Sequence, residues 1–146
     1  MQAVESGAGR GNAGAPGSVT LNAERGLGLA VLKAMSDLYS SKIMESVVSE
    51  GRSVEEISAA TGVPVSTAYR RIHRMTGEGL TIVERVVITR EGKKHRIYRA
   101  TFSRVRAELE PQSCRVEGTP NEGIPDIMYR LWQFEGSERA PMVNPF

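Results

Sequence analysis

A short turn that contains glycine constrains the fold more than any other feature of this chain. Before the turn, Ser53 and Glu56 have the spacing of a capping box, which predicts a short helix over residues 53–60 that ends at Gly62. After the turn, a second helix is predicted over residues 65–75. Two helices that are joined by a short turn containing glycine have the helix-turn-helix arrangement. The rest of the fold is expected to be built around this pair.

Hydrophobic periodicity predicts further helices and strands on both sides of the pair. Apolar residues recur at helical spacing over residues 26–36 and 40–49, which predicts two more helices. Two runs rich in β-branched residues, 81–90 and 95–101, are separated by a turn containing glycine and predict a β-hairpin. The fold class is therefore expected to be α+β, and residues 26–101 are expected to form a winged helix-turn-helix domain.

The two ends of the chain have a different character. Residues 1–25 are rich in glycine and almost lack large apolar side chains, so they are predicted to form a flexible tail. Residues 102–136 are predicted to extend the domain, first with short β-strands and then with an amphipathic helix over about 124–132. Residues 137–146 are predicted to form a second tail. The expected architecture is a winged helix-turn-helix with a C-terminal β extension and a terminal amphipathic helix.

The positive charge of the chain is concentrated in one segment. The full sequence has a formal net charge of only +2. Residues 66–106 hold 11 basic and 3 acidic side chains, whereas residues 1–65 have a net charge of −2 and residues 107–146 one of −4. A concentrated basic patch is typical of proteins that bind polyanions such as nucleic acids. The alternative is a solvated charged face that has no partner.

The second helix of the pair carries residue types that suit DNA. Ala68, Ile72 and Met75 share one face of this helix and are expected to point into the core. The opposite face combines short hydroxyl side chains, which can bond a phosphate, with arginines, which can bond a guanine through two hydrogen bonds. The DNA contacts expected from this helix are Ser66, Thr67, Tyr69, Arg70, Arg71 and Arg74.

The tip of the predicted hairpin is also basic. Lysine and arginine side chains at such a tip can neutralise phosphates of the flanking DNA backbone or enter the minor groove. The two histidines, His73 and His95, are expected to lie near phosphates or at the surface rather than to bind a metal. The DNA contacts expected from the hairpin are Arg90, Lys93, Lys94 and Arg96.

Four segments within residues 27–101 carry a resemblance to a known family: Val31–Asp37, Ser53–Ile57, Thr61–Ile72 and Arg96–Arg99. They resemble the ArsR-type winged helix-turn-helix regulators of bacteria and archaea, and the helix after the turn also resembles that of IclR-type regulators. The resemblance implies a homodimer that binds operator DNA. It also implies recognition positions at Ser66, Thr67, Tyr69, Arg70 and Arg71.

Two features depart from that family. Its metal-sensing members carry a pair of cysteines in or near the helix that corresponds to residues 53–60, and here this helix has none. Pro64 stands where a serine cap is common, although proline fits the first turn of a helix because its missing amide hydrogen would have no partner there. Neither a metal nor a cofactor is therefore expected.

The homodimer is expected to form through apolar side chains of the first and the terminal helix. A small winged helix offers little core to a peripheral helix, so the apolar face of that helix needs another cover. The alternative is that the terminal helix closes the core of a single chain. In the dimer, two recognition helices would read a palindromic site with half-sites about 10 base pairs apart. The residues expected in the dimer contact are Leu27, Val31, Ile127, Leu131 and Trp132.

Several classes of protein are not expected. The apolar stretches are much shorter than the roughly 18 residues that cross a bilayer, so no membrane partner is expected. No secretory signal is evident and the single cysteine, Cys114, cannot form a disulfide framework, so a cytoplasmic location and an inert thiol are expected. No nucleophile lies beside a base and no glycine-rich loop is placed to hold a phosphate, so catalytic residues are not expected.

These features favour a sequence-specific regulator of transcription that binds double-stranded DNA as a homodimer. The alternative is a winged-helix module that docks on a protein of the transcription or replication machinery without reading bases. A ligand or redox sensor acting through residues 102–146 is a third hypothesis. The first two differ in how strongly salt weakens binding, because contacts with phosphates release counterions.

Overall fold

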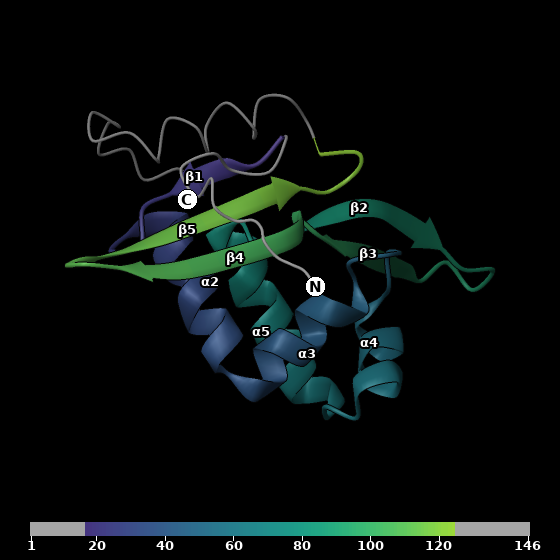
Figure 1. Cartoon of the computed structure of the whole chain (residues 1–146). Coiled ribbons are helices and arrows are strands. Elements are labelled where there is room, and N and C mark those ends of the chain that lie inside the picture. The colour runs from purple at the N-terminus through teal and green to yellow at the C-terminus, as the bar shows by residue number, and fades with distance from the viewer. Residues whose placement is uncertain (1–16, 125–146) are drawn as a thin grey trace, which may run out of the picture.

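Residues 17–124 of the chain are described by a computed structural model, and residues 1–16 and 125–146 lie outside this range. The α+β fold class is confirmed, since the helices gather on one side of the molecule and the strands on the other (Figure 1). Two β-hairpins project from this body in opposite directions (Figure 1). The body and the two hairpins give the molecule its elongated outline.

The helices lie close to their expected positions. Within the described range they are α2 (Gly26–Ser36), α3 (Leu38–Ser46), α4 (Val54–Thr61) and α5 (Val65–Glu78). The helix α3 begins earlier than expected because Asp37 caps its N-terminus, where the carboxylate accepts a hydrogen bond of 2.8 Å from the Ser40 amide. The helix α5 extends past residue 75 and ends at Gly79, whose φ of 89° lies in the left-handed region that favours glycine.

The turn between α4 and α5 follows from the capping residues. The Ser53 hydroxyl accepts a hydrogen bond of 3.2 Å from the Glu56 amide, and the Glu56 carboxylate accepts one of 2.9 Å from the Ser53 amide. Gly62 ends α4 in the left-handed conformation. Pro64 precedes α5 without a side-chain cap. The predicted capping box is therefore confirmed, and it fixes where α4 begins.

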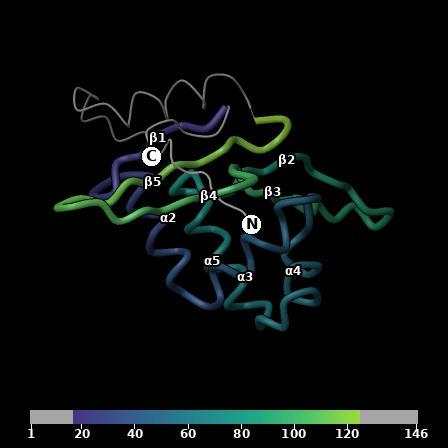
Figure 2. The backbone as a smooth tube through the Cα atoms, viewed as in Figure 1, coloured from purple at the N-terminus to yellow at the C-terminus, as the bar shows by residue number. Residues whose placement is uncertain are grey.

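The strands form two sheets within the described residues. One is an antiparallel three-stranded sheet with the order β1-β5-β4, and the other is the antiparallel hairpin of β2 and β3. Figure 2 shows that β1 and β5, which are far apart in sequence, lie side by side. The strands are β1 (Val19–Leu21), β2 (Thr81–Ile88), β3 (Lys94–Ala100), β4 (Phe102–Glu110) and β5 (Ser113–Pro120).

The strand β1 differs from the flexible tail that the composition of residues 1–25 predicts. Val19 and Leu21 are each only 3% exposed and belong to the core, whereas Thr20 between them is exposed. The backbone of this short segment pairs with β5. The burial of these two side chains and the pairing with β5 give structure to a segment whose composition predicts none. The composition could not indicate this, because neither interaction is local in sequence.

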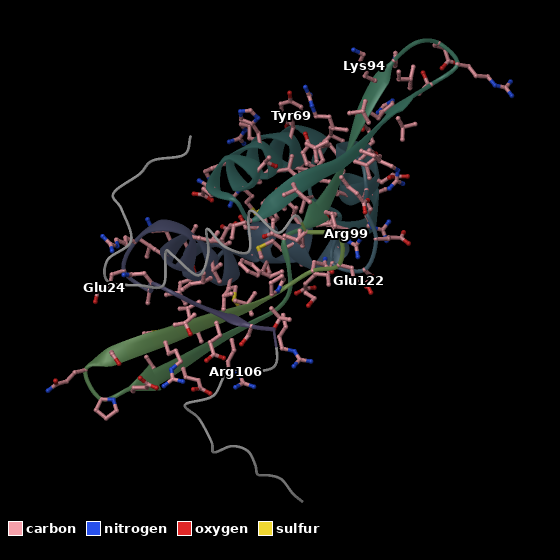
Figure 3. All side chains as sticks on the ribbon, turned by 90° about the horizontal axis from the view of Figure 1, so that it is seen from above. Glu24, Tyr69, Lys94, Arg99, Arg106 and Glu122 are labelled. Atoms are coloured by element: carbon pink, nitrogen blue, oxygen red, sulfur yellow. The ribbon has the colours of Figure 1, made fainter. Side chains whose placement is uncertain are left out.

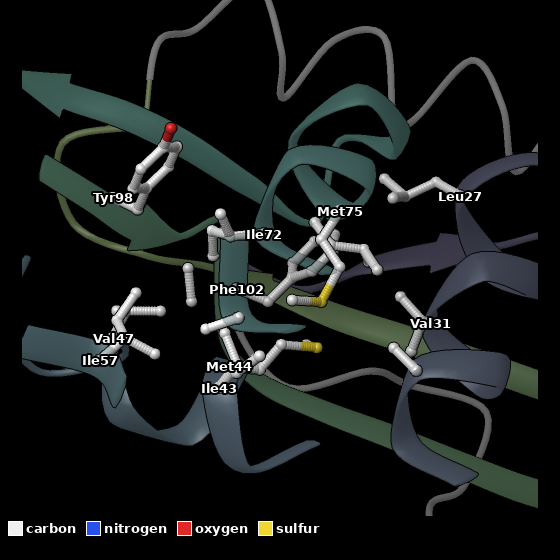
Figure 4. Close-up of a cluster of buried hydrophobic side chains, with 14 of the residues drawn as sticks. Leu27, Val31, Ile43, Met44, Val47, Ile57, Ile72, Met75, Tyr98 and Phe102 are labelled. Carbon is white, nitrogen blue, oxygen red and sulfur yellow. The ribbon is translucent and has the colours of Figure 1, made fainter. Parts of the chain in front are cut away.

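One hydrophobic core joins the helices to the sheets (Figure 4). Ile43 from α3, Ile57 from α4 and Ile72 from α5 are almost completely buried. Phe102 at the start of β4 packs into the same cluster. The predicted inward face of α5 is confirmed, since its buried residues are Ala68, Ile72 and Met75.

Leu27 and Val31 also belong to this core, with exposed fractions of 6% and 0%. This differs from the dimer contact expected for them, because a side chain that is covered within one chain has no area left for a second copy. The other expected dimer residues, Ile127, Leu131 and Trp132, lie outside the described residues. Ile124, at the start of the predicted terminal helix, is partly buried against the core.

Candidate nucleic-acid interface

The face of α5 that points away from the core carries most of the expected contacts. Ser66, Tyr69, Arg70 and Arg74 are exposed, and Thr67 is partly exposed. The burial of the opposite face fixes the rotation of the helix about its axis, because the apolar side chains must stay in the core. The structure therefore brings these five residues together on one solvent-facing surface.

An aromatic pair lies on the same surface. The rings of Tyr69 and His73 are parallel to within 1°, and their centroids are 6.5 Å apart. Both side chains are exposed. Residues four positions apart are neighbours on a helix, so the spacing alone indicates this pairing. His73 thus lies on the surface of the candidate interface, which agrees with its expected place near phosphates or at the surface.

Main-chain hydrogen bonds fix the base of the β2–β3 hairpin to the helices. Arg52 and Tyr98 exchange two of them, with N to O distances of 3.0 and 2.8 Å. The Ala100 amide donates a third, of 2.9 Å, to the Val47 carbonyl. These bonds join β3 to the segment between α3 and α4. The hairpin is therefore held at its base, while its tip extends away from the body (Figure 1).

The basic end of the hairpin and the outward face of α5 lie on the same side of the molecule. Figure 3 shows Lys94 and Tyr69 on this side, away from Arg106 of β4. Burial raises the pKa of the Tyr98 hydroxyl, and the positive charge and hydrogen bond of nearby Arg96 oppose that rise. The hairpin residues expected to contact DNA are all exposed: Arg90, Lys93, Lys94 and Arg96.

Most basic side chains of this side form no ion pair within the described residues. Elsewhere, arginines such as Arg99 and Arg115 lie within 3.1 and 2.7 Å of a carboxylate. Within residues 17–124, by contrast, no ion pair neutralises the following side chains: Arg70, Arg74, Arg90, Lys93 and Lys94. Unpaired cations on one side of a protein create a positive field that attracts polyanions.

Arg71 differs from its neighbours on α5 because it bonds within the chain. Its guanidinium forms an ion pair with Asp37 and donates a hydrogen bond of 3.2 Å to the Ser40 hydroxyl. The same group lies 5.8 Å from the ring centroid of Tyr39. Arg71 therefore ties α5 to the start of α3 and, unlike Arg70 and Arg74, is only partly exposed.

The Asp37 carboxylate is held in its charged form. Hydrogen bonds from the side chain and the amide of Ser40 lower its pKa below the usual value of 3.8, and the charges of Arg71 and Arg74 lower it further, whereas partial burial opposes this change. These interactions favour the ionised carboxylate in the folded chain. The contact between α3 and α5 is consequently sensitive to low pH.

Replacing Asp37 with asparagine is expected to lower the melting temperature at pH 7 and to have little effect in acid. A carboxylate whose pKa is lowered by folding stabilises the folded state above its unfolded value, near 3.8, and this contribution is lost as the pH falls through the lower folded value. Thermal unfolding of both proteins from neutral to acid pH measures the difference. A difference that persists in acid would contradict the role of the charged carboxylate.

A separate cleft of about 670 Å³ lies between the start of α4 and the hairpin. Acidic and basic groups share its walls, including Glu55 and His95, whose Oε1 and Nδ1 atoms are 3.6 Å apart. In the part of the chain that the structure describes, no cluster of three or more histidine, cysteine or acidic residues could hold a metal ion. No residue of α5 and none of Arg90, Lys93, Lys94 and Arg96 lines this cleft, so it lies outside the candidate interface.

A scan against known protein families, a search of curated proteins and a search of solved structures each found no match to this chain. Among the described residues, no helix is both long enough and apolar enough to cross a membrane. Since no relative indicates a function, the proposed function is based on one surface, which combines the exposed face of α5 with the basic end of the hairpin.

Proposed function

We propose that the chain is a winged helix-turn-helix regulator of transcription that binds double-stranded DNA as a homodimer. In this proposal α5 is the recognition helix and the β2–β3 hairpin is the wing. The observation that carries the proposal is the group of basic side chains without ion pairs on one side of the described residues, shared by α5 and the hairpin. A protein surface of this kind matches the phosphate backbone of a duplex.

The recognition helix would divide its contacts by residue type. Ser66 and Thr67 lie in the first turn of α5, where hydroxyl and amide groups can bond a phosphate. Arg70 and Arg74 lie one turn apart and can each bond a guanine edge in the major groove. The exposed ring of Tyr69 can contact a thymine methyl group. The helix would thus combine positioning contacts with base readout.

The wing would add contacts that do not depend on sequence. Arg90, Lys93 and Lys94 lie at or beside the tip of the hairpin, where they can reach phosphates that flank the major groove. Arg96 lies further along β3, where its side chain also forms a hydrogen bond with the Tyr98 hydroxyl. Phosphate contacts of this kind add affinity and fix the orientation of the protein on the duplex.

The alternative function is docking on another protein. The observation that favours it is the exposure of four large apolar side chains on β2, which are Val83, Val86, Val87 and Ile88. Exposed apolar residues on a projecting hairpin are suited to a protein surface. A docking module of this kind would depend much less on salt than a DNA-binding protein.

The dependence of binding on salt distinguishes the two functions. A duplex is selected from a random pool with the full-length chain, and its binding is measured by fluorescence anisotropy. Between about 50 and 200 mM salt, the affinity is expected to fall by at least about 100-fold, because several phosphates are neutralised. A scrambled duplex of the same composition is the control. Equal binding of both duplexes, or an affinity that salt hardly changes, would contradict the proposed function.

A further inference from the structure

The strand β4 is an open edge of the three-stranded sheet. Within residues 17–124 it pairs with β5 and has no strand on its other side. The pairing with β5 is regular from Arg104 to Glu110. An open edge exposes main-chain N–H and C=O groups that can pair with a further strand. A second strand with a matching side-chain pattern would therefore extend this sheet.

The two faces of β4 have different chemistry. Val105, Ala107 and Leu109 alternate along one face, which is the face on which Val116 of β5 is buried opposite the exposed Ala107. Val105 packs against the core, whereas Leu109 at the far end is 90% exposed. The other face of the strand carries only charged side chains from residue 104 onwards, in the order Arg104, Arg106, Glu108 and Glu110. One half of this face is positive and the other half is negative.

We propose that β4 pairs with β4 of a second copy of this chain, antiparallel and centred on Ala107, and that this contact forms the homodimer. The partner's Ala107 then lies directly opposite Ala107. Arg104 faces the partner's Glu110, and Arg106 faces the partner's Glu108. Two-fold symmetry repeats both pairs, so every charge on this face lies opposite a charge of the other sign. Opposite charges across an antiparallel pair stabilise it.

The apolar face supports the same register. With Ala107 at the centre, Val105 faces the partner's Leu109, and the symmetric pair repeats this contact. The exposed Leu109 side chain thereby gains an apolar neighbour that it lacks at the open edge. The register centred on Ala107 therefore gives favourable side-chain contacts on both faces of the strand, as expected for an isologous contact between identical surfaces.

Neighbouring registers are unfavourable. A shift of the centre by one residue places either Arg106 opposite the partner's Arg106 or Glu108 opposite the partner's Glu108. A shift by two residues places Arg104 opposite the partner's Arg106, or Glu108 opposite the partner's Glu110. Like charges directly opposite each other destabilise an antiparallel pair. A centre between two residues instead places the charged side chains opposite uncharged ones. The order of charges on β4 therefore favours the register centred on Ala107.

The charges of β4 are only partly neutralised within one chain. Arg106 and Glu108 are 3.7 Å apart on the same strand, and Glu110 lies 2.7 Å from Arg115 of β5. Arg104 is exposed and is in no ion pair within the described range. In the proposed dimer the partner's Glu110 is the counterion of Arg104.

This proposal rests on the homodimer of the proposed function and names the surface that forms it. It does not require DNA, because the basic side of α5 and the hairpin lies away from Arg106 (Figure 3). The oligomeric state of the free protein therefore tests the proposal separately from DNA binding.

Two charge variants test the contact by analytical ultracentrifugation of the full-length chain without DNA. Arg104→Glu with Arg106→Glu makes the charged face of β4 entirely acidic, and Glu108→Arg with Glu110→Arg makes it entirely basic. Each variant alone is expected to raise the dissociation constant of the dimer at least about 100-fold, because like charges then face each other. An equal mixture of the two variants is expected to form a dimer again, since each strand meets its complement.

A matched control reverses two charges outside β4. Lys33→Glu with Lys42→Glu changes exposed residues of α2 and α3 and is expected to leave the dimer unchanged. The proposal is overturned if the unmodified chain sediments as a monomer, or if both β4 variants remain dimers. A mixture of folded variants that stays monomeric also overturns it. Fluorescence anisotropy with the selected duplex shows separately whether the chain binds DNA, as the proposed function requires.

A cysteine crosslink tests the register even if a charge variant fails to fold. Opposite Cα atoms of an antiparallel pair lie about 4.5 to 5.5 Å apart, which suits a disulfide. Ala107→Cys, combined with Cys114→Ser, is therefore expected to give a covalent dimer on oxidation. Ser103→Cys with Cys114→Ser is the control, because that position would lie about 27 Å from its copy. Failure of Ala107→Cys to crosslink, or equal crosslinking of the control, overturns the proposal.

Discussion

Replacing Arg70 and Arg74 together with alanine is expected to weaken binding to the selected duplex by at least about 100-fold, because each arginine contact with a base contributes about 1 to 3 kcal/mol. Both side chains are exposed on α5, and neither is in an ion pair within residues 17–124, so their removal leaves the core intact. Fluorescence anisotropy on the selected and the scrambled duplex measures the effect. A larger loss on the selected duplex indicates that these arginines read bases.

The control for this variant removes the same charge from another part of the surface. Lys33→Ala with Lys42→Ala changes exposed residues of α2 and α3, and its affinity is expected to stay within about threefold of the parent. Suppose instead that the Arg70 and Arg74 variant binds as tightly as the parent and with the same dependence on salt. The recognition role of α5 would then be wrong.

Replacing Gly28 with alanine is expected to lower the free energy of unfolding by about 3 kcal/mol, because the added methyl group overpacks the site. A Cβ atom at this position would lie 1.9 Å from the main-chain oxygen of Asn22. Backbone atoms cannot rotate away as a flexible side chain can, so α2 or the segment after β1 must shift. Urea unfolding followed by circular dichroism measures the change.

Gly77 is the matched control for this substitution. It also lies within a helix, α5, but a Cβ atom there would have no neighbour within 4 Å. Gly77→Ala is therefore expected to stabilise the chain by about 0.5 to 1 kcal/mol through helix propensity. A lower free energy of unfolding for Gly28→Ala together with a higher one for Gly77→Ala would support the close approach of Asn22 to α2. Stabilisation by both would contradict it.

Local signals explain why the helices could be predicted from the sequence. The capping box at Ser53 and the glycines at 62 and 79 act within one or two turns of the helix that they bound. The inward face of α5 follows from the spacing of its apolar residues in the same way. The strand β1 has no such signal, because its partner in β5 lies almost a hundred residues later.

The candidate interface shows the same division between local and distant interactions. Helical spacing is enough to place Arg70 and Arg74 on the outward face of α5. It cannot show that Arg71 is held by Asp37, since these residues are 34 positions apart. The burial of Leu27 and Val31 depends likewise on how α2 packs against the other elements. Exposure of a side chain was thus predictable from its own helix, whereas its partners were not.

The pairing of β1 with β5 has a consequence for the order in which the chain folds. During synthesis the helices α2 to α5 leave the ribosome well before β5, so they can pack while β1 still lacks its neighbour. The sheet that contains β1 closes only when residues 116–118 have emerged. Until then Val19 and Leu21 lack the strand that pairs with their backbone. The first strand of the described chain is therefore among the last parts to become native.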